Sequence, residues 1–152
     1  MIEKRLAELI PILVVDDDKE DQDLIEIGFR RNKIANPIYQ VYDGEALLKF
    51  IYNEPPYEDK EQYPEPGLIL LDLNMPKVSG REALQVIKSD PRKKHIPIVV
   101  LTTSSQEEDI LQTYDLGANS FITKPVALTD FIALFDKLGN YWLGVVSLPQ
   151  HE

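Results

Sequence analysis

Five short apolar runs mark the chain, and a stretch with apolar residues at near-helical spacing follows each of them. The central run, 68–71, contains no polar residue, which is typical of a strand buried on both faces of a parallel sheet. The runs that predict strands are 10–15, 38–42, 68–71, 96–101 and 119–123. The stretches that predict helices are 19–31, 43–51, 80–88, 104–116 and 129–142. Strands that alternate with helices predict an α/β fold, with a doubly wound five-stranded parallel sheet flanked by five helices.

The pattern predicts one domain with short flanking segments. Residues 1–9 form a lead-in, 10–142 the domain, and 143–152 a tail that we expect to serve as an arm for dimerisation or partner binding. The stretch 53–67 contains four prolines and five acidic residues, so we expect a long surface loop there. A chain of 152 residues is long enough to bury a single core.

The composition excludes several kinds of site and partner. Because the chain has no cysteine, it contains no disulfide, iron–sulfur cluster or thiolate zinc site. No apolar run approaches the ~20 residues of a membrane span, and the amino terminus lacks the layout of a signal peptide. The net charge of -10 argues against nucleic acid and anionic membranes as partners, while it suits a bound cation. We therefore expect a cytoplasmic protein.

Polar residues that can do chemistry stand where the apolar runs end. Asp16 and Asp17 follow the first run, Asp72 the third, Thr102 the fourth and Lys124 the fifth. In a doubly wound sheet of order 2-1-3-4-5 the first and third strands are neighbours, and ligands bind beside their carboxyl ends. The carboxylates would converge there and repel one another unless a hard divalent cation joins them, for which Mg²⁺ is the natural choice. The alternative is a set of separate solvated acids, with Asp72 only capping the next helix.

Lys124 and Thr102 extend this group from a metal site to a phosphoryl site. A lysine in such a place is often no more than an exposed charge. Beside a bound cation its ammonium can hold an incoming anion, and the hydroxyl of Thr102 can bind the same anion. A carboxylate among these groups can act as an in-line nucleophile and form an aspartyl phosphate. We predict that Asp72 has this role because it ends the central strand, and that Asp16 and Asp17 are metal ligands.

Taken together, these residues resemble the receiver domain of two-component response regulators, over about residues 12–138. The motifs that carry the resemblance are the acid pair at 16–17, Leu-Asp-Leu-Asn-Met-Pro at 71–76 with Gly80, Thr102, and Phe-Ile-Thr-Lys-Pro at 121–125. The resemblance implies a flavodoxin-like fold that is phosphorylated by a sensor histidine kinase with Mg²⁺ as cofactor. The resemblance also implies that Asp72 is the phosphoacceptor, and that Asp17, Asp72 and the backbone carbonyl of Asn74 bind the metal directly. It implies that Asp16 acts through a metal-bound water and that Lys124 binds the phosphoryl group. Thr102 and Phe121 would form a switch pair, and the peptide bond before Pro125 would be cis.

The loop 53–67 and the tail after 141 carry a second resemblance. They are similar to segments of response regulators partnered with bacterial and cyanobacterial phytochromes, which implies a phytochrome-type kinase upstream. Apolar residues wrap more of the stretch 129–142 than one core face requires, which predicts a partner surface used in a homodimer, with a wide core face as the alternative. The residues predicted for this surface are Phe135, Tyr141, Trp142, Val145 and Leu148.

We therefore predict a single-domain response regulator, a switch rather than an enzyme. Because the chain ends at Glu152, we expect no attached output domain, so the output would pass to a downstream protein, a dimer or a histidine phosphotransfer protein. Phosphorylation would switch the face formed by the last two strands and helices.

Three other classes of function are alternatives to this prediction. A magnesium-dependent phosphatase with an aspartyl-phosphate intermediate would use the Asp-x-Asp pattern of Asp16 and Asp18. A pseudo-receiver would only bind partners, although the acid, Thr102 and Lys124 positions are all filled. A nucleotide-binding module is disfavoured because no glycine-rich phosphate loop follows a strand.

Overall fold

The computed structural model describes residues 10–31, 36–73, 80–102, 117, 120–123, 129–130 and 133. Within them the five predicted strands are present and form one parallel sheet of order β2-β1-β3-β4-β5, as predicted. The strands are β1 (Ile12–Val15), β2 (Ile38–Val41), β3 (Leu68–Asp72), β4 (Ile98–Thr102) and β5 (Ser120–Thr123).

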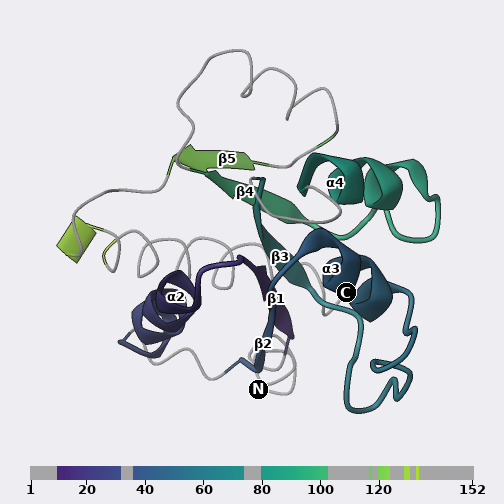
Figure 1. Ribbon diagram of the computed structural model, residues 1–152, viewed down its shortest axis with the longest axis horizontal. Coiled ribbons are helices and arrows are strands. Elements are labelled where there is room, and N and C mark those ends of the chain that lie inside the picture. Colours follow the sequence, from purple (N-terminus) through teal and green to yellow (C-terminus); the bar gives the residue numbers. More distant parts are fainter. Residues whose placement is uncertain are drawn as a thin grey trace, which may run out of the picture.

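The described residues form three of the predicted helices: α2 (Lys19–Arg31), α3 (Gly44–Ile51) and α4 (Gly80–Ser89). Figure 1 shows α2 on one side of the sheet, and α3 with α4 on the other. The predicted helix 104–116 and the flanking segments 1–9 and 143–152 lie outside the described residues. Of the predicted helix 129–142, the structure describes residues 129, 130 and 133, which are all helical. No described helix is long and apolar enough to cross a membrane.

Alternation along the strands divides the core into two clusters, one on each face of the sheet. Successive side chains of a strand point to opposite faces, so an uninterrupted apolar run supplies both clusters at once. The strand residues packed with α2 are Ile12, Val14, Leu68, Leu70, Val99 and Leu101. Those packed with α3 and α4 are Leu13, Val15, Val41, Ile69, Leu71, Ile98 and Val100.

Two strands begin later than predicted because of prolines. Pro11 and Pro97 have no N–H to give to a ladder, so β1 starts at Ile12 and β4 at Ile98. Their carbonyls still take part, since Pro11 accepts from the N–H of Gly67 and Pro97 from that of Ile69. Ile96 belongs to the preceding turn, because its N–H donates to the carbonyl of Lys93.

Two apolar residues assigned to helices on the basis of spacing prove to be solvent-facing. Ile27 on α2 is 46% exposed and Val86 on α4 is 43% exposed. The core face of α2 instead consists of Gln22, Ile25, Gly28 and Phe29, which are all buried. Gln22 is the polar residue in that face, and the helix prediction rested on apolar positions alone.

The predicted surface loop 53–67 is a packed structure of turns. Asn53 has a left-handed backbone with φ of 52°, and its side-chain amide donates to the carbonyls of Tyr57 at 3.0 Å and Tyr63 at 3.1 Å. The rings of Tyr57 and Tyr63 lie 5.1 Å apart and pack on Phe50, with centroid distances of 5.3 Å and 5.7 Å. The loop therefore extends the core on the α3 side of the sheet.

Polar contacts join this region to the turn between α4 and β4. The hydroxyl of Tyr52 donates to Asp90 at 2.6 Å, and Glu65 contacts Lys93 at 3.1 Å and His95 at 3.0 Å. Partial burial would raise the pKa of the Glu65 carboxyl, but its His95 and Lys93 partners hold that pKa below its ordinary value. These contacts lie at the amino ends of β3 and β4, the end of the sheet opposite Asp72.

Candidate metal centre

The carboxyl ends of β1 and β3 bring the predicted acids together. Val15 is paired with Leu71 in the parallel register, so Asp16 and Asp72 are the next residues along the two neighbouring strands. Val15 and Leu71 both face α3 and α4, and the alternation turns Asp16 and Asp72 toward the α2 side. The apolar runs thus decide where the two carboxylates lie.

Asp16, Asp17 and Asp72 form a compact acidic cluster. One carboxylate oxygen from each lies within 4.8 Å of the others. Asp16 is 1% and Asp72 7% exposed, while Asp17 is exposed. Three negative charges this close repel one another strongly, and more so where burial lowers the local dielectric constant. Oxygen ligands of this kind suit a hard divalent cation, which would remove the repulsion.

Local hydrogen bonds fix the main chain that carries the acid pair. The N–H of Asp16 donates to the carbonyl of Val41 in β2 at 3.2 Å, and its Oδ1 accepts from the N–H of Asp18 at 2.9 Å. Asp18 in turn begins α2: its Oδ1 accepts from the N–H of Glu20 at 2.9 Å, and its carbonyl accepts from the N–H of Gln22 at 3.0 Å. Asp18 is therefore the helix cap, a role that the sequence reasoning missed.

Gln22 is a buried polar residue beside the acid pair. Its Nε2 contacts the carbonyls of Val14 at 3.1 Å, Asp16 at 3.2 Å and Val41 at 2.9 Å. Its spacing could have predicted its burial, because positions 22, 25 and 29 share the core face of α2.

Gly80 brings the start of α4 directly against the end of β3. Its N–H donates to the carbonyl of Leu73 at 3.2 Å. A Cβ at this position would lie 2.7 Å from Cα of Leu73 and closer still to the carbonyl oxygen of Asp72. Since both neighbours are backbone atoms, only glycine allows this approach.

The remaining predicted site residues lie at or beyond the ends of β4 and β5. Thr102 ends β4 and is paired in backbone register with Thr123, the residue before Lys124. Phe121 is paired with Val100 in the same register. The other predictions fall outside the described residues: Asn74, Lys124, Pro125, Phe135, Tyr141, Trp142, Val145 and Leu148. Within the described part of the chain, Pro55-Pro56 has a cis peptide bond.

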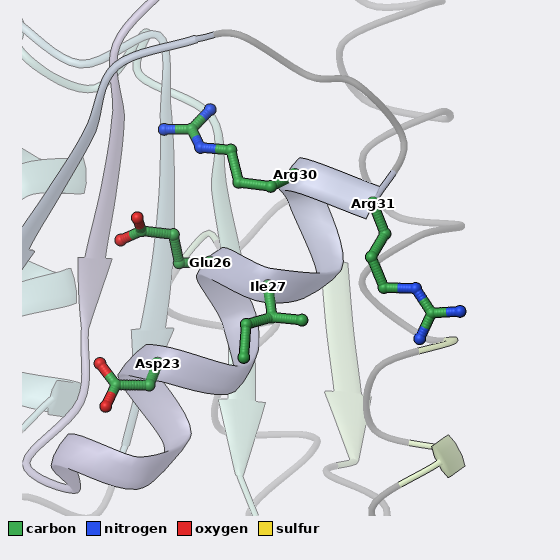
Figure 2. Close-up of a pocket in the computed structure, with 5 residues that line it drawn as sticks. All are labelled: Asp23, Glu26, Ile27, Arg30 and Arg31. Atoms are coloured by element: carbon green, nitrogen blue, oxygen red, sulfur yellow. The ribbon is translucent and has the colours of Figure 1, made fainter.

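A pocket on the outer face of α2 shares no described residue with the acidic cluster. Figure 2 shows its described lining, in which Ile27 lies between acids nearer the start of the helix and two arginines at its end. The lining residues are Asp23, Glu26, Ile27, Arg30 and Arg31. The order of these charges complements the helix dipole, so it has a local structural explanation.

Comparison with known proteins identifies the family. A model of the response regulator receiver domain matches residues 12–136, which cover all five strands and the acidic cluster. The chain is a response regulator receiver. This confirms the predicted fold class and the first resemblance, and it places the protein in two-component signal transduction.

Relatives of this receiver include phytochrome response regulators. It is 40% identical over 138 residues to response regulator Rcp1 of Synechocystis sp., covering 91% of this chain and 92% of Rcp1. The crystal structure of Mn²⁺-bound Rcp1 has a TM-score of 0.83 and 38% identity, covering 90% of this chain and 96% of that one. The crystal structure of the phosphorylated cyanobacterial phytochrome response regulator RcpA also has a TM-score of 0.83 and 38% identity, covering 89% of this chain and 94% of that one.

Proposed function

We propose that this receiver accepts a phosphoryl group from the phosphohistidine of a sensor kinase onto Asp72, with Mg²⁺ as cofactor. The observation that carries the proposal is the convergence of three carboxylates within 4.8 Å at the end of the central strand. Asp16, Asp17 and Asp72 would hold the cation, joined by the backbone carbonyl of Asn74. The cation would offset negative charge as the phosphoryl group approaches the carboxylates.

The transfer is a substitution at phosphorus. An Oδ of Asp72 forms the new O–P bond while the P–N bond to the donor imidazole breaks, and the imidazole leaves with that electron pair and takes up a proton. The contribution of the protein is to hold the carboxylate in line and to compensate charge. Asp72 suits this role because β3 lies between two strands and its last residue is nearly buried.

The ends of β4 and β5 would supply the switch. Thr102 is proposed to bind a phosphoryl oxygen through its hydroxyl, Lys124 to bind another, and the ring of Phe121 to change rotamer with Thr102. Support comes from backbone register, which sets Thr102 beside Thr123 at neighbouring strand ends, directly before Lys124. Phosphorylation would shift a two-state equilibrium of the face that contains β4 and β5, so the protein acts as a switch rather than a metabolic enzyme.

A phytochrome-type histidine kinase is the proposed phosphoryl donor. Support comes from the relatives, since RcpA is a phytochrome response regulator and is phosphorylated. The reaction would take place in the cytoplasm, and the output would pass to a downstream protein or histidine phosphotransfer protein, with a homodimer as the functional unit. A Mn²⁺-bound form of Rcp1 supports a divalent cation in this receiver. Mg²⁺ is proposed because carboxylate and carbonyl oxygens suit both ions.

The phosphatase alternative loses support at Asp18. That function needs a general acid two residues after the first acid, but Oδ1 of Asp18 accepts a backbone N–H at the start of α2. A pseudo-receiver would not need the three acids to converge. Neither alternative explains why Asp72, on the third strand, closes the cluster.

The test is the intact mass of the protein after incubation with Mg²⁺ and acetyl phosphate, followed by incubation with a phosphorylated phytochrome-type kinase. We expect one phosphoryl mass on wild type and none on Asp72→Asn. Asp23→Asn, which removes an exposed acid of α2, is the matched control and should be labelled like wild type. Label on Asp72→Asn at wild-type stoichiometry would refute the site, and no label from either donor would refute the function.

A further inference from the structure

We propose that Gln22 is a positioning residue for the metal and phosphoacceptor site. The inference rests on the proposed function and adds to it a residue that touches neither the cation nor the phosphoryl group. Gln22 would act through the backbone of Asp16, by holding the carboxyl ends of β1 and β2 at one separation.

The geometry places one amide group at the centre of two strand ends. Nε2 of Gln22 lies within 3.2 Å of three carbonyl oxygens, those of Val14, Asp16 and Val41. Its two hydrogens are therefore shared among three acceptors. Val41 also accepts the N–H of Asp16 at 3.2 Å, so the same carbonyl links both residues.

Asp16 is consequently held on both sides of its Cα. Its N–H is bonded to β2, and its carbonyl accepts from α2 through Gln22. The first bond restrains the peptide plane between Val15 and Asp16, and the second restrains the plane between Asp16 and Asp17. Together they set the direction in which the second acid leaves the strand. Asp17 is exposed, so this main-chain restraint is what aims it at Asp72.

Burial makes a glutamine at this position costly unless its amide is needed. The side chain is 0% exposed, and its Oε1 is buried without a hydrogen-bond partner among the described residues. An unsatisfied buried acceptor is unfavourable, and an apolar residue of similar size would avoid it. The three carbonyls around Nε2 also determine which end of the amide is the donor, because an oxygen there would face only acceptors.

The decisive experiment compares Mg²⁺ affinity in two variants of α2. Gln22→Met keeps the length and volume of the side chain but removes both donors. Ile25→Val trims a fully buried residue one turn further along the same helix, so it lowers stability while it leaves the side-chain amide of Gln22 in place. Dissociation constants for Mg²⁺ are measured by calorimetry, and melting temperatures are measured for both variants and wild type.

We expect Gln22→Met to weaken Mg²⁺ binding by about tenfold, the lower end of what loss of an outer-shell partner costs at metal sites. The dissociation constant of Ile25→Val for Mg²⁺ should stay within about twofold of wild type, although its loss of melting temperature is comparable to that of Gln22→Met. Equal affinity in Gln22→Met and wild type would overturn the proposal, and so would equal weakening in both variants. Wild type that binds Mg²⁺ yet is never phosphorylated would refute the proposed function and leave this comparison intact.

A measurement on wild type keeps the proposal testable if Gln22→Met fails to fold. The side-chain amide of Gln22 should give slowly exchanging ¹⁵N–¹H signals, because both hydrogens are buried and bonded. On titration with Mg²⁺ these signals should shift with the same midpoint as the backbone amides of Asp16 and Asp17. Signals that do not respond to Mg²⁺ while those amides do would overturn the positioning role.

Discussion

Replacing Gly80 by alanine tests how closely the start of α4 approaches the end of β3. The new Cβ would lie 2.7 Å from Cα of Leu73 and nearer still to the carbonyl oxygen of Asp72. These are backbone atoms and cannot rotate away, so α4 and the end of β3 must separate. Gly80→Ala should therefore disturb both the stability of the fold and the geometry of the phosphoacceptor.

The size of the effect follows from two opposing contributions. Overpacking a tight contact costs about 1–3 kcal/mol. Alanine is favoured over glycine in a helix by about 1 kcal/mol, and by less at the first helical residue, which is where Gly80 stands. The net loss should be about 1–2 kcal/mol, or about 2–8 °C in melting temperature for a chain of this length.

Urea unfolding measures the stability change, and a Mg²⁺ titration measures the effect on the acidic cluster. Gln85→Ala, on the exposed side of the same helix, is the control and should change neither quantity appreciably. We expect Gly80→Ala to weaken Mg²⁺ binding as well, because Asp72 moves relative to Asp16 and Asp17. A Gly80→Ala protein that is as stable as wild type and binds Mg²⁺ equally well would refute the close contact.

Three further predictions concern Tyr52, Asn53 and Asp17. The Tyr52 hydroxyl is the main cause that lowers the pKa of Asp90 to about 2, so Tyr52→Phe should raise that pKa. A depressed carboxyl pKa stabilises the fold above about pH 4, and this stabilisation is lost as the pH falls toward 2. The stabilities of the two proteins should therefore become equal in acid. An NMR titration of Asp90 whose midpoint stays near 2 in the variant would contradict this. Asn53→Gly should lower the free energy of unfolding by about 2 kcal/mol, because two hydrogen bonds are lost. Asn53→Ala should lower it by about 1–2 kcal/mol more, because alanine disfavours the left-handed backbone at this position. Equal stabilities of the two variants in chemical denaturation would contradict this order. Asp17→Asn should weaken Mg²⁺ binding by at least about tenfold yet raise the metal-free melting temperature, since one repelling charge is gone; wild-type values of both would remove Asp17 from the cluster.

The sequence predicted the sheet because β1 and β3 are buried along their whole length, and their apolar runs therefore lack polar interruptions. Asp16, Asp17 and Asp72 could be grouped from the same pattern, since strand ends at one edge of a parallel sheet must meet. Gln22 could not be found in this way, because its role depends on carbonyls from two strands separated by α2 in the chain. The packing of Tyr57 and Tyr63 was missed for a related reason: prolines and acids gave the loop a polar character, while long-range ring contacts determine its structure.

Prolines explain why β1 and β4 begin later than predicted. Apolar character continues through Ile10 and Ile96, but the ladder cannot start until the chain has passed Pro11 and Pro97. Periodicity likewise assigned Ile27 and Val86 to helices without telling which side of the helix is buried. Exposure depends on what packs against a helix, and no local pattern contains that information.

The contacts between the region 52–67 and the turn before β4 affect the stability of the protein when its acidic cluster holds no cation. At one end, β3 carries a carboxylate held against two others, which favours strand separation whenever the cation is absent. At the other end, the chains entering β3 and β4 are joined through Tyr52 with Asp90 and through Glu65 with Lys93 and His95. Sequence changes in this distant loop should therefore alter the stability of the metal-free receiver, and with it the lifetime of the folded protein before a signal arrives.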